Sequence, residues 1–116
     1  MKREILFRGK RIDNGEWVYG DLMQKPSGQK YIHTSPCWNE VIPETVGQYT
    51  GVKDKNGIRI FEWDIYHKRD KNIKCKVVWN DSGLMGKQIG TYGSYEGLTY
   101  WINYIEVIGN IHDNQN

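Results

Sequence analysis

The sequence predicts an all-β protein, on three observations. The 116 residues contain no alanine, the best helix former, but thirteen isoleucines, eight tyrosines and five tryptophans, which are typical of strands. Thirteen glycines divide the chain into short segments. Two Asn-Gly pairs, Asn14-Gly15 and Asn56-Gly57, lie between β-type runs, as in tight hairpins. The length favours a single domain.

The first hairpin is expected at the N-terminus, with strands over residues 3–12 and 16–23 and positive φ at both Asn14 and Gly15. In its second arm, alternation places Trp17, Tyr19 and Met23 on one face and Val18, Gly20 and Leu22 on the other. Because both faces carry apolar groups, we expect this hairpin to be covered on both sides, at least in part.

A short strand over residues 30–34 follows. Residues 35–40 contain Pro36 and precede Pro43, which limits regular pairing, so they are interpreted as an irregular insertion between two halves of the chain. The remaining strands are expected over residues 45–50, 58–68, 73–80, 98–102 and 105–111, with a glycine-rich hairpin region over 81–97. For residues 98–102 the alternative is a short helical turn around Tyr100–Tyr104.

Charge is distributed unevenly. Residues 1–12 and residues 68–76 each carry five basic side chains against one acidic one, whereas the whole chain has a net charge of only +2. Such segments make a basic face only if their side chains converge. The sequence shows neither an apolar leader nor a membrane-spanning run, so we expect a cytoplasmic protein without membrane contact, whose Cys37 and Cys75 are reduced thiols.

We expect neither catalytic residues, nor a metal site, nor a cofactor. His33 and Cys37 have a helical ligand spacing, but they lie in a strand and a loop, and no second ligand pair accompanies them. Asp54, Glu62 and Asp64 cluster around a turn, where acidic residues are common, and the calcium-loop pattern is incomplete. No phosphate-binding glycine loop or nucleophile motif is present.

Nucleic-acid binding has more support, because basic side chains and aromatic rings are close together in the second half of the sequence. Small barrels that bind nucleic acid combine cations with rings on which bases stack. The candidate nucleic-acid contacts are Lys68, Arg69, Lys71, Lys74 and Lys76, with Tyr92, Tyr95, Tyr100 and Trp101 nearby. The alternative is that the lysines keep strand edges from pairing with other chains.

Three segments together resemble the YopX family of phage and prophage proteins. They are REILFRGKRIDNGEWVYGDL (Arg3–Leu22), VIPETVGQYTGVKDKNGIRIFEWDI (Val41–Ile65) and IEVIGNIHDN (Ile105–Asn114), which cover roughly half the chain in the order of the family. The resemblance implies one YopX-like domain over residues 1–116, with a β-hairpin subdomain over 1–57 and an SH3-like small barrel over 58–116. It also implies a phage or prophage origin and the bacterial host cytoplasm, but no activity, because the family is uncharacterised.

The chain departs from the resemblance at one position. The family pattern usually has Glu-Gly-Asp-Ile where this chain has Glu62-Trp63-Asp64-Ile65. A glycine there indicates a bulge or a close backbone approach. The tryptophan therefore either changes that geometry or fills a pocket that is open in relatives.

Two function classes follow. The first is a non-catalytic binding module whose partner is a nucleic acid or a host or phage protein. The second is a structural or assembly protein that works as a homo-oligomer, because exposed aromatic patches mark interfaces. The residues expected at such a protein interface are Trp17, Tyr19, Trp38 and Trp63. An enzyme is the least favoured class, since no catalytic constellation supports one.

Overall fold

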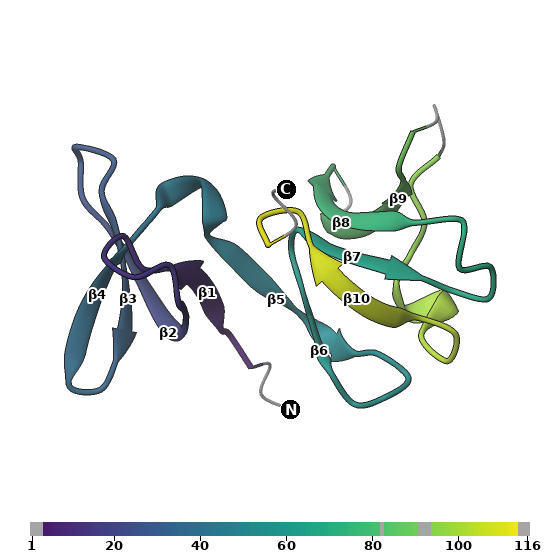
Figure 1. Ribbon diagram of the computed structural model, residues 1–116, viewed down its shortest axis with the longest axis horizontal. Helices are drawn as coiled ribbons and strands as arrows, with labels where there is room; N and C mark the ends of the chain where they lie inside the picture. The colour runs from purple at the N-terminus through teal and green to yellow at the C-terminus, as the bar shows by residue number, and fades with distance from the viewer. Residues whose placement is uncertain (1–3, 82, 91–93, 114–116) are drawn as a thin grey trace. The chain divides into compact units, whose positions relative to one another are not determined.

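The computed structural model describes residues 4–81, 83–90 and 94–113, and these residues confirm the all-β class (Figure 1). The strands are β1 (Phe7–Lys10), β2 (Trp17–Gln24), β3 (Lys30–Thr34), β4 (Cys37–Val41), β5 (Gly47–Lys53), β6 (Arg59–Phe61), β7 (Asp64–His67), β8 (Cys75–Asn80), β9 (Gly83–Gln88) and β10 (Glu106–Asn110). Two 3₁₀ turns complete the list, η1 (Pro43–Thr45) and η2 (Thr99–Trp101). Among the described residues, no helix is long and apolar enough to cross a membrane.

The strands form two antiparallel sheets, in the orders β4-β3-β2-β1-β5-β6 and β10-β7-β8-β9. The chain divides into two compact units, residues 1–49 and 50–116. Residue 57, the expected end of the first subdomain, lies in the turn between β5 and β6. The first three residues of β5 belong to the first unit, and the rest of this hairpin belongs to the second, where Val52 and Ile60 pack into the core.

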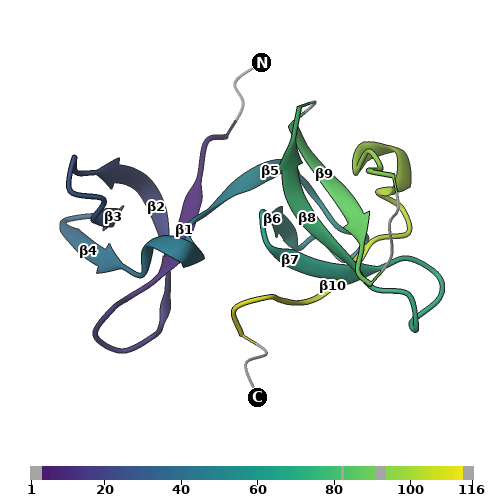
Figure 2. The same cartoon turned by 90° about the horizontal axis from the view of Figure 1, so that it is seen from above.

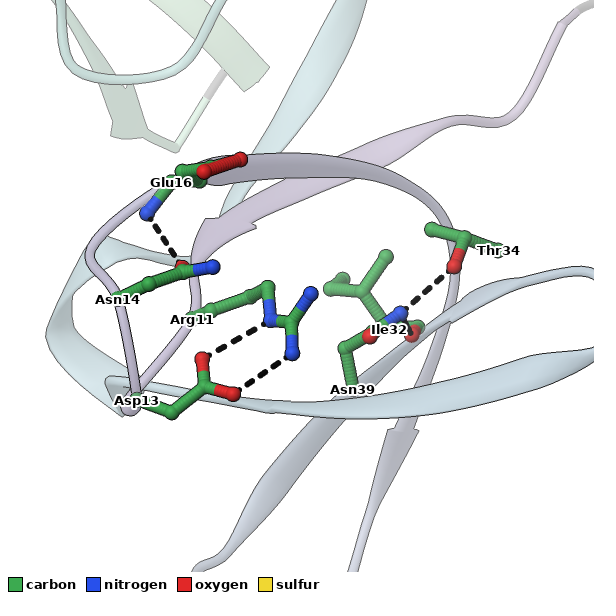
Figure 3. A network of polar contacts seen from close by, with 7 residues as sticks. All are labelled: Arg11, Asp13, Asn14, Glu16, Ile32, Thr34 and Asn39. Atoms are coloured by element: carbon green, nitrogen blue, oxygen red, sulfur yellow. Dashed lines mark hydrogen bonds and ion pairs between the residues drawn. The ribbon is translucent and has the colours of Figure 1, made fainter.

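The first unit begins with the expected hairpin, in which β1 pairs with β2. Its connection is longer than a two-residue turn: the N–H of Arg11 donates to the carbonyl of Glu16 at 2.9 Å, and positive φ occurs at Gly15 but not at Asn14. Side chains stabilise the loop instead (Figure 3). The Asn14 Oδ1 accepts from the N–H of Glu16 at 2.9 Å, and Arg11 donates two hydrogen bonds to Asp13, at 3.0 and 2.6 Å. The hydrogen bonds from Arg11 lower the pKa of the exposed Asp13 carboxyl.

Residues 35–40 are not an irregular insertion. Thr34 is paired with Cys37, so Ser35-Pro36 is a two-residue turn and β4 continues the sheet beside β3. The proline lies in the turn and therefore removes no donor from the ladder. The Asn39 amide fastens β4 to β3 by donating to the Ile32 carbonyl at 3.2 Å and to the Thr34 Oγ1 at 2.7 Å (Figure 3).

One face of β2 is covered only in part, within the expectation of at least partial cover on both faces: Trp17 on this face is half-buried. Tyr19 and Met23 are 47% and 37% exposed, whereas Val18 and Leu22 on the other face are half-buried. The buried side chains of Ile32 and Val41 lie on the same inner face of the sheet as Val18 and Leu22. The first unit is therefore a curled sheet with an apolar inside and an aromatic outside.

The second unit packs the β5–β6 hairpin against the four-stranded sheet. Its core consists of buried side chains from both layers and from the connection before β10: Ile60, Tyr66, Cys75, Val77, Leu98 and Ile105. Between β9 and β10 the chain runs back past β9, where Gly86 and Glu96 form an isolated bridge (Figure 2). In the described residues the ladder ends at β9 on one side and at β10 on the other, an open sheet without barrel closure.

Residues 98–102 are not a strand but contain η2, in agreement with the helical-turn alternative. The strand expected over residues 58–68 is also interrupted. It breaks at Glu62-Trp63 into β6 and β7, which belong to different sheets. Trp63 has a φ of 77° and is the one non-glycine residue with positive φ in the described part of the chain.

Hydrogen bonds stabilise the turn at Glu62-Trp63 between β6 and β7. The N–H of Trp63 donates to the Val77 carbonyl at 2.9 Å, and its own carbonyl accepts from the N–H of Ile111 at 3.0 Å. The Asp64 Oδ2 accepts from the N–H of Phe61 at 2.7 Å. The Trp63 ring is half-buried and lies edge-on to His112, with 6.2 Å between ring centroids. The tryptophan thus keeps the backbone conformation that a glycine would favour.

Replacing Trp63 by alanine and by glycine should give an unusual order of stabilities. Trp63→Ala loses the ring and keeps the cost of positive φ, whereas Trp63→Gly loses the ring and relieves that cost. We expect the glycine variant to be more stable than the alanine variant by about 1 kcal/mol in urea unfolding. Trp79, 52% exposed in regular β8, is the matched control. At position 79 the glycine variant should be less stable than the alanine variant. If the glycine variant is the less stable one at position 63 as well, the backbone of Trp63 is not strained.

Candidate functional site

The candidate site is a pocket of about 330 Å³ in the second unit, beside the end of β7. Its lining consists of Lys68, Arg69, Asp70, Ile73, Gln88 and Trp101. Next to it, η2 and the residues after it carry three aromatic rings in contact. The Trp101 ring centroid lies 5.1 Å from that of Tyr100 and 6.1 Å from that of Tyr104. Tyr100 is 80% exposed, more than any other large apolar or aromatic side chain in the described residues.

Two cations lie on this aromatic cluster. The Lys68 Nζ is 4.0 Å from the centroid of the Trp101 ring, and the Arg69 guanidinium carbon is 4.2 Å from that of Tyr104. Both distances are within the range of cation–π attraction. Positive charge and exposed aromatic side chains, Tyr100 above all, therefore occur together at one place, as they do where proteins bind single-stranded nucleic acid.

A buried polar network positions Lys68. Its ammonium donates to the Glu96 Oε1 at 2.8 Å, and the hydroxyl of the fully buried Tyr66 donates to the Glu96 Oε2 at 2.6 Å. Burial raises the pKa of Tyr66, and the Glu96 carboxylate raises it further, so the hydroxyl stays protonated and continues to donate. Burial also raises the pKa of the neighbouring Cys75 thiol. Cys75 is thus a buried thiol and a poor nucleophile.

The structure does not bring all five predicted basic residues together. Lys68 and Arg69 line the pocket, and Lys71 and Lys74 lie exposed on the turn that follows, on either side of Ile73. Lys76 lies between Cys75 and Val77, which point into the core, and so it points to the opposite face of the sheet. Its partner there on β9 is Lys87, whose ammonium is 5.4 Å from the Tyr95 ring centroid. Tyr92 lies outside the described residues.

The four aromatic residues expected at a protein interface are also divided. Trp17 and Tyr19 on β2 and Trp38 on β4 share the outer face of the first unit. Trp38 is 47% exposed, stacks on His33 with centroids 4.6 Å apart, and borders a pocket of about 300 Å³ with Arg11, Asp13 and Glu40. Trp63, by contrast, is the half-buried turn residue of the second unit.

Other polar side chains have structural roles. Asp54 and Asp64 are buried and accept backbone N–H groups. His67 is buried, with its Nε2 3.5 Å from the Glu106 Oε1. Over residues 4–81, 83–90 and 94–113, no three His, Cys, Asp or Glu side chains gather in a way that would hold a metal ion.

Sequence reasoning missed five members of the site: Asp70, Ile73, Gln88, Glu96 and Tyr104. The aromatic run that contains Tyr100 and Trp101 could have indicated Tyr104, which follows them closely. No local pattern indicated Glu96, because its partners lie 28 and 30 residues away in the sequence.

A comparison with known protein families identifies the family of this chain. The chain matches the YopX protein family over residues 6–116, nearly its whole length. No curated protein is significantly similar to it in sequence. The match includes both units and every residue of the candidate site, and it agrees with the three resembling segments. The chain therefore belongs to the YopX family.

Proposed function

We propose that this protein is a non-catalytic binding module whose second unit binds single-stranded nucleic acid on the aromatic cluster. The observation that carries the proposal is the pairing of cations with rings, Lys68 with Trp101 and Arg69 with Tyr104, beside the exposed Tyr100. Unpaired bases stack on such rings whatever their identity, and the cations attract the phosphates.

The cations near the pocket differ in how available they are. The charge of Lys68 is offset by Glu96 at 2.8 Å, so Lys68 serves mainly to position the rings. Arg69 has no ion pair with the carboxylates of the described residues, and Lys71 and Lys74 are exposed on the adjoining turn. Arg69 and Lys71 are the side chains that would contact phosphates. Lys74 lies between Ile73, which lines the pocket, and Cys75, which points into the core, so it points to the same side as Lys76. Since about two contacts are available, the logarithm of affinity should fall with the logarithm of salt with a slope of about −1.4.

A second line of support is the architecture of the second unit. We infer that it is a variant of the SH3-like small barrel, in which the β5–β6 hairpin covers the four-stranded sheet through Val52 and Ile60. Such small β folds carry many unrelated binding functions, so the fold allows the proposal and the site itself argues for it.

The alternative, a homo-oligomeric assembly protein, rests on the outer face of the first unit. That face is less suited to the centre of a self-interface, because cations cover two of its rings. Arg8 and Lys10 lie 4.6 and 5.5 Å from the Trp17 ring centroid, and Lys25 lies 5.0 Å from that of Tyr31. Charged residues are depleted at interface cores, so nucleic-acid binding by the second unit is the stronger proposal.

Fluorescence anisotropy with labelled single strands of about ten nucleotides tests the proposal. At low salt we expect binding by the wild type and about 10-fold weaker binding by Arg69→Ala and by Tyr100→Ala, since one stacking contact is worth 1–3 kcal/mol. Lys76→Ala is the matched control: it also removes one positive charge, but from the opposite face of the sheet. Its affinity should stay within about twofold of the wild type.

Absence of binding at low salt would refute the proposal, because the electrostatic attraction is strongest there. Equal losses for Arg69→Ala and Lys76→Ala would indicate a diffuse charge effect in place of this site. The slope of the logarithm of affinity against the logarithm of salt should change in Arg69→Ala but not in Tyr100→Ala. That difference would distinguish the phosphate contact from the stacking contact.

A further inference from the structure

We propose that the pocket beside the aromatic cluster takes one unstacked base of the bound strand and prefers guanine. This inference rests on the proposed function, because it assumes that a single strand follows the cluster. It goes further in assigning sequence preference to a strand-binding surface whose stacking contacts alone would accept any base.

The size and the walls of the pocket suit a base. Its volume of about 330 Å³ leaves room for one base with its sugar. Trp101 supplies a half-buried indole and Ile73 an aliphatic side chain, so the lining has apolar surface for a flat ring. Proteins that read single-stranded RNA or DNA place splayed-out bases against aromatic side chains in this way.

The polar groups of the pocket carry the preference. Asp70 is exposed, and its Oδ1 accepts one hydrogen bond, from the N–H of Asn72 at 2.9 Å. An ionised carboxylate has about four acceptor positions, so Asp70 retains acceptors for a ligand. Among the bases, guanine alone offers two adjacent donors on its Watson–Crick edge, the N1–H and the N2 amino group. A carboxylate matches that pair as a bidentate acceptor, and it repels the acceptor atoms that adenine, cytosine and uracil present beside their donors.

Gln88 complements Asp70. Its amide is exposed at the end of β9 and can donate to the guanine O6, the acceptor next to the N1–H. The backbone places this residue at the pocket, because Gln88 pairs with Cys75 across β8 and β9 and the N–H of Ile89 donates to the Lys74 carbonyl at 2.9 Å. Asp70 and Gln88 therefore supply acceptor and donor groups in the combination that the guanine edge requires. Arg69, on the same pocket, would hold the neighbouring phosphate.

The test uses oligothymidylate strands with a single central substitution by guanine, adenine, cytosine or hypoxanthine, and the full-length protein. We expect the strand with guanine to bind about 10-fold more tightly than the strand with adenine, the discrimination of one good bidentate contact. Hypoxanthine lacks the N2 amino group and keeps the N1–H and O6, so its strand should have intermediate affinity.

Asp70→Asn is the decisive variant. Asparagine retains an Oδ1 for the Asn72 N–H and so preserves the turn, but one acceptor of the pair becomes a donor. We expect this variant to bind guanine and adenine strands equally, with little change for unsubstituted oligothymidylate. Lys76→Ala should keep the wild-type preference.

Failure of this inference is distinguishable from failure of the proposed function. If the wild type binds all five strands with equal affinity, the guanine pocket is refuted and the strand-binding surface stands. The same holds if Asp70→Asn retains the preference for guanine. If no strand binds at low salt, both the surface and the pocket are refuted.

Discussion

Asp54→Ala is expected to destabilise the second unit by about 3–4 kcal/mol, the largest effect of any single polar substitution that we predict. Asp54 lies between a turn and the edge strand β10, and only 6% of the residue is exposed. It accepts three backbone hydrogen bonds. The Oδ1 accepts from Asn56 at 2.8 Å and Ile58 at 2.9 Å, and the Oδ2 accepts from Val107 at 2.9 Å.

These three bonds join parts of the chain that are distant in sequence. Two of them fix the turn between β5 and β6, and the third, across 53 residues, binds an N–H of the edge strand β10. Hydrogen bonds to a charged acceptor are worth about 1.5–3 kcal/mol each, and the exposed turn amides recover part of that from water. A loss of this size is a large share of the stability of a small domain and should lower the melting temperature by about 12 °C or more.

Asp70→Ala is the control for this substitution, because Asp70 also closes a turn but accepts one N–H, that of Asn72, and is exposed. Its cost should be at most about 1 kcal/mol. Urea unfolding gives the free energies, and hydrogen exchange at the Val107 amide gives a local readout, since that amide should lose protection in Asp54→Ala. Equal costs for the two alanine variants would contradict the role assigned to Asp54.

The part of the fold that could be predicted from the sequence is the part that local chemistry determines. Runs rich in β-branched and aromatic residues became strands, and the polar turns with Asn14 and Asn56 became hairpin connections. The break at Trp63 could not be predicted, because a tryptophan gives no indication of positive φ, and long-range bonds to Val77 and Ile111 impose that conformation. The place of Pro36 could not be predicted either. The proline favours an irregular segment, but the pairing of β3 with β4 puts it in a two-residue turn.

The site was predictable to the extent that it is local in sequence. Lys68 and Arg69 are adjacent, and Trp101 lies in a visible aromatic run, so the basic and aromatic components could be identified. Their convergence in one pocket could not, since it requires the β7–β8 pairing and the return of the chain past β9. Alternation along β8 then removes Lys76 from the group. Proximity in the sequence had grouped Lys76 with the other basic residues, although its side chain points to the opposite face of the sheet.

Gly86→Ala is expected to cost about 3 kcal/mol, because the new methyl group would meet the most deeply buried aromatic side chain of the second unit. A Cβ at this position would lie 1.8 Å from the Tyr66 hydroxyl oxygen and 2.9 Å from the ring carbon that carries it. Tyr66 is fully buried and its hydroxyl donates to Glu96 at 2.6 Å, so a shift of the ring would disturb both the core and this hydrogen bond. The clash must displace either β9 or the ring, and both belong to the core.

Two further variants make this prediction specific. Gly97→Ala should be close to neutral, since a Cβ there meets nothing within 4 Å and no positive φ opposes it. Tyr66→Phe removes the oxygen that the new methyl group would strike. We therefore expect Gly86→Ala with Tyr66→Phe to be more stable than Gly86→Ala alone, although Tyr66→Phe by itself is destabilising because it removes one of the two donors to Glu96. Additive costs in this cycle would show that the penalty at Gly86 arises elsewhere.

The same substitution links the core to the binding surface. If the methyl group displaces the Tyr66 hydroxyl, Glu96 loses one of its two donors, and the Lys68 ammonium is no longer fixed 4.0 Å above the Trp101 ring. Gly86→Ala should therefore weaken strand binding under conditions in which the variant is still folded, whereas Gly97→Ala should not. Such a loss at a residue that does not line the pocket would mean that a glycine on β9 positions the cation of the candidate site through the buried Tyr66 and the half-buried Glu96.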